Sequence, residues 1–131
     1  MRKLLLILTI VFITNLLLTA CSSSSKTDAP AKAVEDYWNV VVAKDVDRLP
    51  TLVCGDWEGE ALTVLDSLQA VTARLEDVSC KQTGTDGDTA LVNCTGNIVA
   101  TYNNEDQKID LSVYTYQVKQ EGGDWLVCGT R

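Results

Sequence analysis

Cysteine is the residue type in this sequence with the most distinctive chemistry. Cys54, Cys80, Cys94 and Cys128 are spread through the body of the chain, and Cys21 follows an apolar N-terminal segment. Their spacings are long, no Cys-x-x-Cys pair occurs and the chain contains no histidine, so disulfides are a better explanation than zinc. A catalytic thiol would also lack a histidine to activate it. In an exported chain, four such cysteines predict two disulfides in one of three connectivities.

The first 21 residues predict export. A basic start, an apolar segment at residues 4–18 and small residues after it are the three parts of a secretory signal peptide. The ending Leu-Thr-Ala-Cys resembles the bacterial lipobox, in which the cysteine is acylated and becomes the first residue after cleavage. The resemblance implies a signal peptide at residues 1–20 and a palmitate-type lipid on Cys21.

An uncleaved transmembrane anchor and an ordinary secretory signal are the alternatives. The apolar segment is shorter than the ~20 residues that a spanning helix usually needs, and it carries polar residues. A cysteine with two or more acyl chains would anchor the protein stably, whereas one chain is marginal. Aspartate after the cysteine resembles an inner-membrane retention signal, and here the residue is Ser22. We therefore expect an extracytoplasmic protein anchored in the outer membrane, or in the cell membrane of bacteria that lack an outer one.

The mature chain is expected to be a tether followed by one domain. Residues 21–29 are small and polar and have no periodicity, whereas residues 30–131 suffice for a single core. Without residues 1–20 the chain has nine basic and 18 acidic residues, a net charge of −9. This excess argues against nucleic acid as a partner and against electrostatic attachment to anionic lipid. The lipid on Cys21 is then the expected membrane contact.

Apolar residues at helical spacing predict helices in the first half of the domain. An amphipathic helix is expected over about 31–43, a short second one over 45–53 with Val46, Leu49 and Val53 facing inward, and a third over about 57–70. From Val71 the periodicity changes to two, with turn residues between the apolar segments. This predicts an α+β fold in which helices precede a four-stranded antiparallel meander. The expected strands are residues 71–83, 89–102, 107–119 and 125–131.

The first expected hairpin suggests how the cysteines pair. A turn at Asp86 and Gly87 places Cys80 opposite Asn93 or Cys94, so a cross-strand Cys80–Cys94 disulfide is a reasonable hypothesis. The remaining pair, Cys54 and Cys128, would join the helical part to the last strand. That bridge closes a loop of about 75 residues, worth roughly 4 kcal/mol in the chain-entropy account.

The layout of helix, short helix, helix and meander resembles the nuclear transport factor 2-like (cystatin-like) cone found in small bacterial lipoproteins. The phrases that carry the resemblance are Ala33–Trp38, Lys44–Leu49 and Glu121–Val127. It covers about 30–131 and implies a curved, cone-like sheet packed on the helices. Cones of this fold often dimerise through the sheet, so a homodimer is one expectation. The fold hosts enzymes and binding modules alike and does not select a function.

Two sets of residues are candidates for a functional site. Asp110, Tyr114 and Tyr116 share one face of the third expected strand, and enzymes of the resembling fold, such as ketosteroid isomerase, hold a carboxylate base and an acidic hydrogen-bond donor in the cone. The simpler interpretation is a solvent-exposed sheet face, so no catalytic residue is predicted. Tyr37 and Trp38 could line a ligand cavity, and the simpler interpretation is ordinary core.

We therefore expect a non-enzymatic binding or interaction module of the cell envelope, without metal or cofactor, whose partner is a small ligand or an envelope protein. An isomerase- or dehydratase-type enzyme and an inhibitor of a basic secreted hydrolase are the alternatives. An enzyme should have a deep cavity with at least two carboxyl or phenol groups. An inhibitor should have a protruding rigid loop, and a small-ligand binder an apolar cavity with few ionisable groups.

Overall fold

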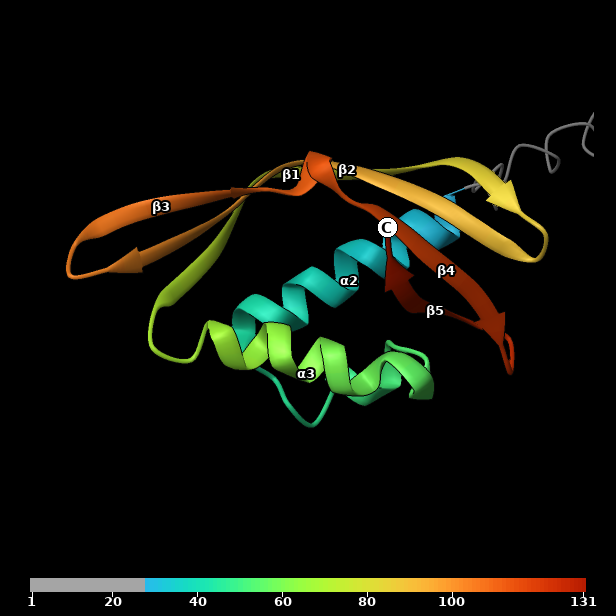
Figure 1. Ribbon diagram of the computed structural model, residues 1–131, viewed down its shortest axis with the longest axis horizontal. Coiled ribbons are helices and arrows are strands. Elements are labelled where there is room, and N and C mark those ends of the chain that lie inside the picture. The colour runs from blue at the N-terminus through green and yellow to red at the C-terminus, as the bar shows by residue number, and fades with distance from the viewer. Residues whose placement is uncertain (1–27) are drawn as a thin grey trace, which may run out of the picture.

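The computed structural model describes residues 28–131, so the expected signal peptide at residues 1–20, Cys21 and most of the tether lie outside the described residues. The described part is α+β, as expected, with two α helices followed by an open antiparallel sheet of five strands (Figure 1). The helices are α2 (Ala29–Ala43) and α3 (Glu58–Ser67), the 3-10 turns are η2 (Leu49–Thr51), η3 (Gly55–Trp57) and η4 (Leu111–Val113), and the strands are β1 (Thr72–Asp86), β2 (Thr89–Tyr102), β3 (Glu105–Asp110), β4 (Thr115–Glu121) and β5 (Asp124–Thr130).

Helix α2 is the centre of the core. Its apolar stripe, which includes Val34, Tyr37 and Val41, is almost entirely removed from solvent. The helix ends where Lys44 takes a left-handed conformation, and the Lys44 backbone N–H donates to carbonyls of the last turn. The Lys44 ammonium donates to the Val71 carbonyl (2.6 Å) and so ties the end of α2 to the segment that enters β1.

The expectation of a second helix over 45–53 is wrong in its extent and in the position of Val46, whereas Leu49 and Val53 are buried as expected. Only the 3-10 turn η2 forms there, and Val46 is 46% exposed. The chain then runs beside β5 instead of continuing as a helix, because Cys54 N–H donates to the Val127 carbonyl (2.9 Å) and Val127 N–H donates to the Leu52 carbonyl (2.9 Å). This pairing covers part of the outer edge of β5.

The expected third strand at residues 107–119 is two strands, which corrects the four-stranded meander to five. Strand β2 pairs with β4 over its first half and with β3 over its second half. The break between them is η4, where the Asp110 carboxylate accepts a hydrogen bond from Ser112 N–H (2.8 Å) and Leu111 is completely buried. Capping by Asp110 and burial of Leu111 stabilise a turn where alternation alone indicates a continuous strand.

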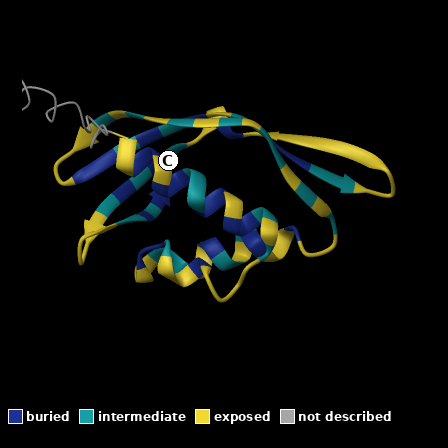
Figure 2. Cartoon of the chain, turned by 180° about the vertical axis from the view of Figure 1, so that it is seen from behind, coloured by how far each residue is buried: buried dark blue, intermediate teal, exposed yellow. Residues whose placement is uncertain are grey.

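The long β1–β2 hairpin is irregular opposite η4. The register shifts between Glu76 and Ser79, and Asp77 and Gly96 take positive φ angles of 52° and 92°. A bulge of this kind bends a sheet. Beyond it, residues 72–76, 97–102 and 105–110 pair as three strands. The outer end of the β2–β3 hairpin, residues 100–107, projects from the body, and we call it the arm (Figure 1). Burial is concentrated on the helices and the central sheet, whereas β3 is exposed along its length (Figure 2).

Candidate functional site: an aromatic cavity

A cavity of about 180 Å³ lies where both helices meet the sheet. An engineered cavity of roughly 150 Å³ in another protein holds benzene, so this one can hold a group about the size of one ring. The lining is mainly apolar, and none of its residues is acidic or basic. Five aromatic residues, Tyr37, Trp38, Trp57, Tyr114 and Tyr116, line the cavity together with Val64, Ser67, Leu68, Ile98, Ile109 and Thr130.

The aromatic rings contact one another at steep angles. Tyr37 and Trp38 on α2 have ring centroids 4.9 Å apart at an interplanar angle of 61°, and Trp38 and Tyr116 are 6.2 Å apart at 87°. Trp57 lies 5.5 Å from Tyr37, and Tyr114 lies 6.4 Å from Tyr116. Edge-to-face pairs are a favourable arrangement because the positive edge of one ring meets the negative face of the next. The aromatic wall thus joins residues that lie far apart in the sequence.

One buried hydrogen bond links the helix to the sheet within this wall. The Trp38 indole N–H donates to the Tyr116 hydroxyl oxygen across 3.0 Å. Burial raises the pKa of Tyr116 to about 12, although the hydrogen bond from Trp38 acts in the opposite direction. Burial also raises the pKa of Tyr37 well above its ordinary value. Both phenols are therefore neutral at physiological pH.

The mouth of the cavity is formed by the partly exposed side chains of Ile109 and Tyr114. The backbone that carries Tyr114 is fixed by Asn93, whose amide donates to the Tyr114 carbonyl (3.1 Å) and to the Thr115 hydroxyl (3.0 Å). Thr83 in β1 donates to the Asn93 side-chain oxygen (2.7 Å). This hydrogen-bond network crosses β1, β2 and β4 and positions the mouth of the cavity. Sequence analysis did not identify Asn93, because alternation marks it only as a polar strand residue.

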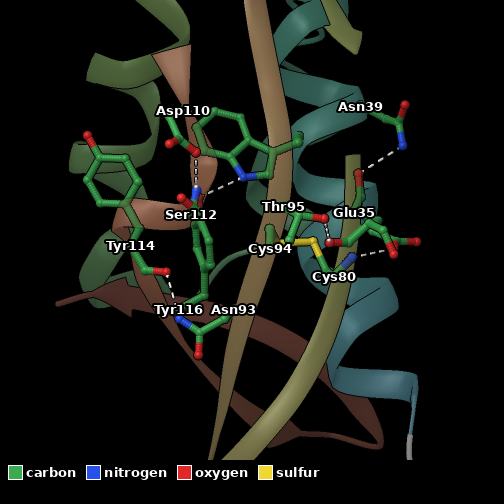
Figure 3. Close-up of a disulfide and its surroundings, with 12 residues drawn as sticks. Glu35, Asn39, Cys80, Asn93, Cys94, Thr95, Asp110, Ser112, Tyr114 and Tyr116 are labelled. Carbon is green, nitrogen blue, oxygen red and sulfur yellow. Dashed lines mark hydrogen bonds between the residues drawn. A yellow bond between two sulfur atoms is a disulfide. The ribbon is translucent and has the colours of Figure 1, made fainter. Parts of the chain in front are cut away.

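The structure brings together only part of the candidate set Asp110, Tyr114 and Tyr116. Both tyrosines line the cavity, and Tyr116 is completely buried, so the prediction of a solvent-exposed face is wrong for Tyr116. Asp110 is exposed and is not part of the lining; its hydrogen bonds with Ser112 hold its pKa below the ordinary value. Figure 3 shows Asp110, Ser112 and both tyrosines on one side of the Cys80–Cys94 disulfide. The break at η4 separates Asp110 from the strand that carries Tyr116.

Tyr37 and Trp38 are core residues that also line the cavity, so both interpretations of this pair apply. Trp57 is half-buried in the wall, just before α3. Ser67 and Thr130, which sequence analysis did not single out, add hydroxyl groups to the lining. Ser67 is detectable in retrospect because it lies three residues after Val64 on one helix face, whereas no pattern marks Thr130.

The four cysteines form two disulfides, Cys54–Cys128 and Cys80–Cys94. In the first hairpin Cys80 lies directly opposite Cys94, and α2 supports this point because Glu35 accepts a hydrogen bond from Cys80 N–H (2.9 Å; Figure 3). Cys54, Glu121 and Cys128 are the only group of potential metal ligands found in residues 28–131. Because the two sulfurs are bonded to each other, they offer no thiolate to a metal.

Comparisons with family models, curated proteins and solved structures found no match to this chain. Among residues 28–131, no helix is long and apolar enough to cross a bilayer.

Proposed function

We propose that this chain is a lipid-anchored, extracytoplasmic binding protein of the cell envelope, and that its aromatic cavity binds a small ligand about the size of one ring. The domain would follow the nuclear transport factor 2-like layout, with the cavity at the open side of the cone. Acylation of Cys21 would hold it at the membrane through the tether.

The observation that carries the binding function is the chemistry of the lining. Ligand sites are concave and mostly apolar, with a few polar groups that fix orientation. Here five rings supply the apolar walls, and the exposed Ser67 and Thr130 hydroxyls are polar groups of the lining that a ligand can reach. Proton-transfer catalysis would need a base, and the lining residues include no carboxylate or histidine. The three phenols of the lining, Tyr37, Tyr114 and Tyr116, reach the number expected of an enzyme, but without a base they favour binding over an isomerase- or dehydratase-type reaction.

The proposal is tested by filling the cavity. Mature protein, purified from membranes in a non-ionic detergent, is titrated with phenol, indole and cyclohexanol while tryptophan fluorescence and binding heat are recorded. Val64→Phe places a ring in the cavity, and we expect at least a tenfold loss of affinity for any compound that binds. Leu62→Phe makes a similar enlargement on the same helix outside the lining, and we expect affinity close to that of the unmodified protein.

Two results would contradict the proposal: no measurable binding of the three compounds or of the ammonium ligand tested below, or binding that survives Val64→Phe unchanged. A thermal unfolding scan of each variant confirms that the substitutions leave the domain folded.

The arm supports a second candidate function, inhibition of another protein. It projects from the body, all of β3 is exposed, and Tyr102 near its tip is 61% exposed (Figure 2). If the arm inserts into a basic hydrolase, Tyr102→Ala should weaken inhibition while Val64→Phe leaves it unchanged, and inhibition should weaken as salt rises. Assays against a panel of secreted hydrolases, with both variants, test this candidate.

A further inference from the structure

We infer that the ligand of the aromatic cavity is a small organic cation of the quaternary or tertiary ammonium type, held by ring faces and without a carboxylate inside the cavity. The inference rests on the proposed ligand-binding function and names the chemical class of its ligand.

The first argument is the arrangement of the rings. The faces of Trp and Tyr carry negative electrostatic potential and attract a cation that lies within about 6 Å of the ring centroid. Tyr37, Trp38 and Tyr116 are almost fully buried, so the rings that a ligand can reach are the half-buried Trp57 and the 40% exposed Tyr114. Trp57 is inclined at 48° to Tyr37, and Tyr114 at 57° to Tyr116. Rings at such angles form walls that meet at corners and do not stack on each other. The positive N–H edge of Trp38 is directed at the Tyr116 oxygen, so the wall itself satisfies this donor.

The second argument is that no positive charge of the protein competes within the lining. None of the lining residues is Lys or Arg. Arg131 follows the lining residue Thr130, and its guanidinium lies 3.4 Å from the Asp86 carboxylate. The Lys44 ammonium donates to the Val71 carbonyl. An anionic ligand would meet the negative ring faces with no cation to balance its charge.

The third argument is the charge around the mouth. Of the two charged residues that flank the mouth residue Ile109 in β3, Lys108 is paired with the Glu76 carboxylate, and the other is the exposed Asp110. Its hydrogen bonds with Ser112 keep its carboxyl pKa low, so it is ionised at neutral pH. The chain from Cys21 onward carries a net charge of −9, which raises the local concentration of cations. The negative charge of the protein surface thus attracts the cation, and the ring faces of the lining hold it inside the cavity.

Size is the fourth argument. A trimethylammonium group is similar in bulk to a benzene ring, and the cavity of about 180 Å³ is large enough for such a group. The Thr130 hydroxyl, which is exposed and belongs to the lining, can form a hydrogen bond with a hydroxyl or carbonyl oxygen carried next to the cation. Choline has this combination and is therefore the first probe to use.

The experiment compares choline with 3,3-dimethylbutan-1-ol, which has the same shape but a neutral carbon in place of the nitrogen. Calorimetry on the mature protein in non-ionic detergent should show choline binding at least tenfold more tightly, a difference of about 1.4 kcal/mol. Tyr114→Leu removes one ring at the mouth and should reduce this preference about threefold or more, while affinity for the neutral alcohol stays nearly constant. Tyr102→Leu, an exposed tyrosine outside the lining, should change neither.

The outcomes separate the two proposals. Equal affinity for choline and its neutral isostere would overturn the cation inference and leave the cavity as a ligand site. Choline binding that disappears at high salt and is indifferent to Tyr114→Leu and Val64→Phe would show attraction to the acidic surface only, and would overturn the inference as well. If choline, the isostere and the ring compounds above all fail to bind, the ligand-binding function itself is wrong.

Discussion

At the scale of single residues, Gly96 and the Trp38–Tyr116 pair have the most consequence for the cavity. A Cβ atom on Gly96 would lie only 2.5 Å from the Asp77 carbonyl oxygen, and the φ angle of 92° is one that L side chains rarely adopt. Gly96 therefore permits the bulge that bends the sheet. The Trp38–Tyr116 hydrogen bond then fixes α2 against β4 at the cavity wall.

We predict that Gly96→Ala lowers the free energy of unfolding by about 2 kcal/mol or more, because the added methyl strains the backbone and meets β1. Gly59→Ala is the matched control: it lies in the first turn of α3 with open space around it, and it should raise stability by about 0.5 kcal/mol. Urea unfolding followed by fluorescence measures both. A neutral effect of Gly96→Ala would show that the bulge does not require glycine.

The raised pKa of Tyr116 predicts a loss of stability in alkali. A tyrosine whose pKa is 10.0 when unfolded and about 12 when folded contributes nothing to the pH dependence below pH 10, and stability falls as pH rises from 10 to 12 because the unfolded chain releases its proton first. Urea unfolding at pH 9 and pH 11.5 should show a smaller decrease for Tyr116→Phe than for the unmodified protein. Tyr102→Phe, at an exposed position, should retain the full decrease.

At the scale of elements, the two disulfides hold two different parts of the fold. Cys80–Cys94 joins neighbouring strands of the hairpin next to the bulge, whereas Cys54–Cys128 joins the segment before α3 to β5. The second bridge lies where Cys54 N–H also bonds to the Val127 carbonyl, so covalent and hydrogen bonds support the same contact. Trp57, three residues after Cys54, reaches the cavity wall from this anchored segment.

We predict that Cys54→Ala/Cys128→Ala costs roughly 4 kcal/mol and Cys80→Ala/Cys94→Ala about 3 kcal/mol, because the first bridge closes the longer loop (sequence separation 74 against 14). Denaturant unfolding of the two double variants gives the comparison. Peptide mapping without reduction checks the pairing itself, and a peptide joining Cys54 to Cys80 would contradict it.

At the scale of the whole molecule, charge and anchoring act together. Acidic residues outnumber basic ones two to one after residue 20, and the ion pairs Lys32–Asp36 and Arg74–Asp106 are exposed, so each adds little stability. The acidic surface would repel anionic lipid headgroups. Membrane attachment of the proposed protein would then depend on the acyl chains alone.

We accordingly predict that Cys21→Ser abolishes palmitate labelling and removes the protein from the membrane-anchored lipoprotein fraction, whereas Cys128→Ala remains labelled. Metabolic labelling with palmitate, followed by membrane fractionation, tests this. Intact mass before and after reduction adds a second check: the chain should begin at acylated Cys21 and should gain the hydrogens of two reduced disulfides. An unacylated chain or four free thiols would overturn the proposed location.

The sequence by itself determined the elements whose signals are local. The first helix and the β1–β2 hairpin follow from apolar periodicity and from the Asp-Gly turn. The turn places Cys80 opposite Asn93 or Cys94, and the structure selects Cys94. The tertiary structure alone decided where periodicity ends. Residues 45–53 form only the turn η2 and then pair with β5 at Leu52 and Val53, and capping by Asp110 with burial of Leu111 splits the third strand. The cavity was also decided by the tertiary structure alone. Its wall joins Trp38 to Tyr116 across 78 positions and exists only when a bent sheet closes over the helices.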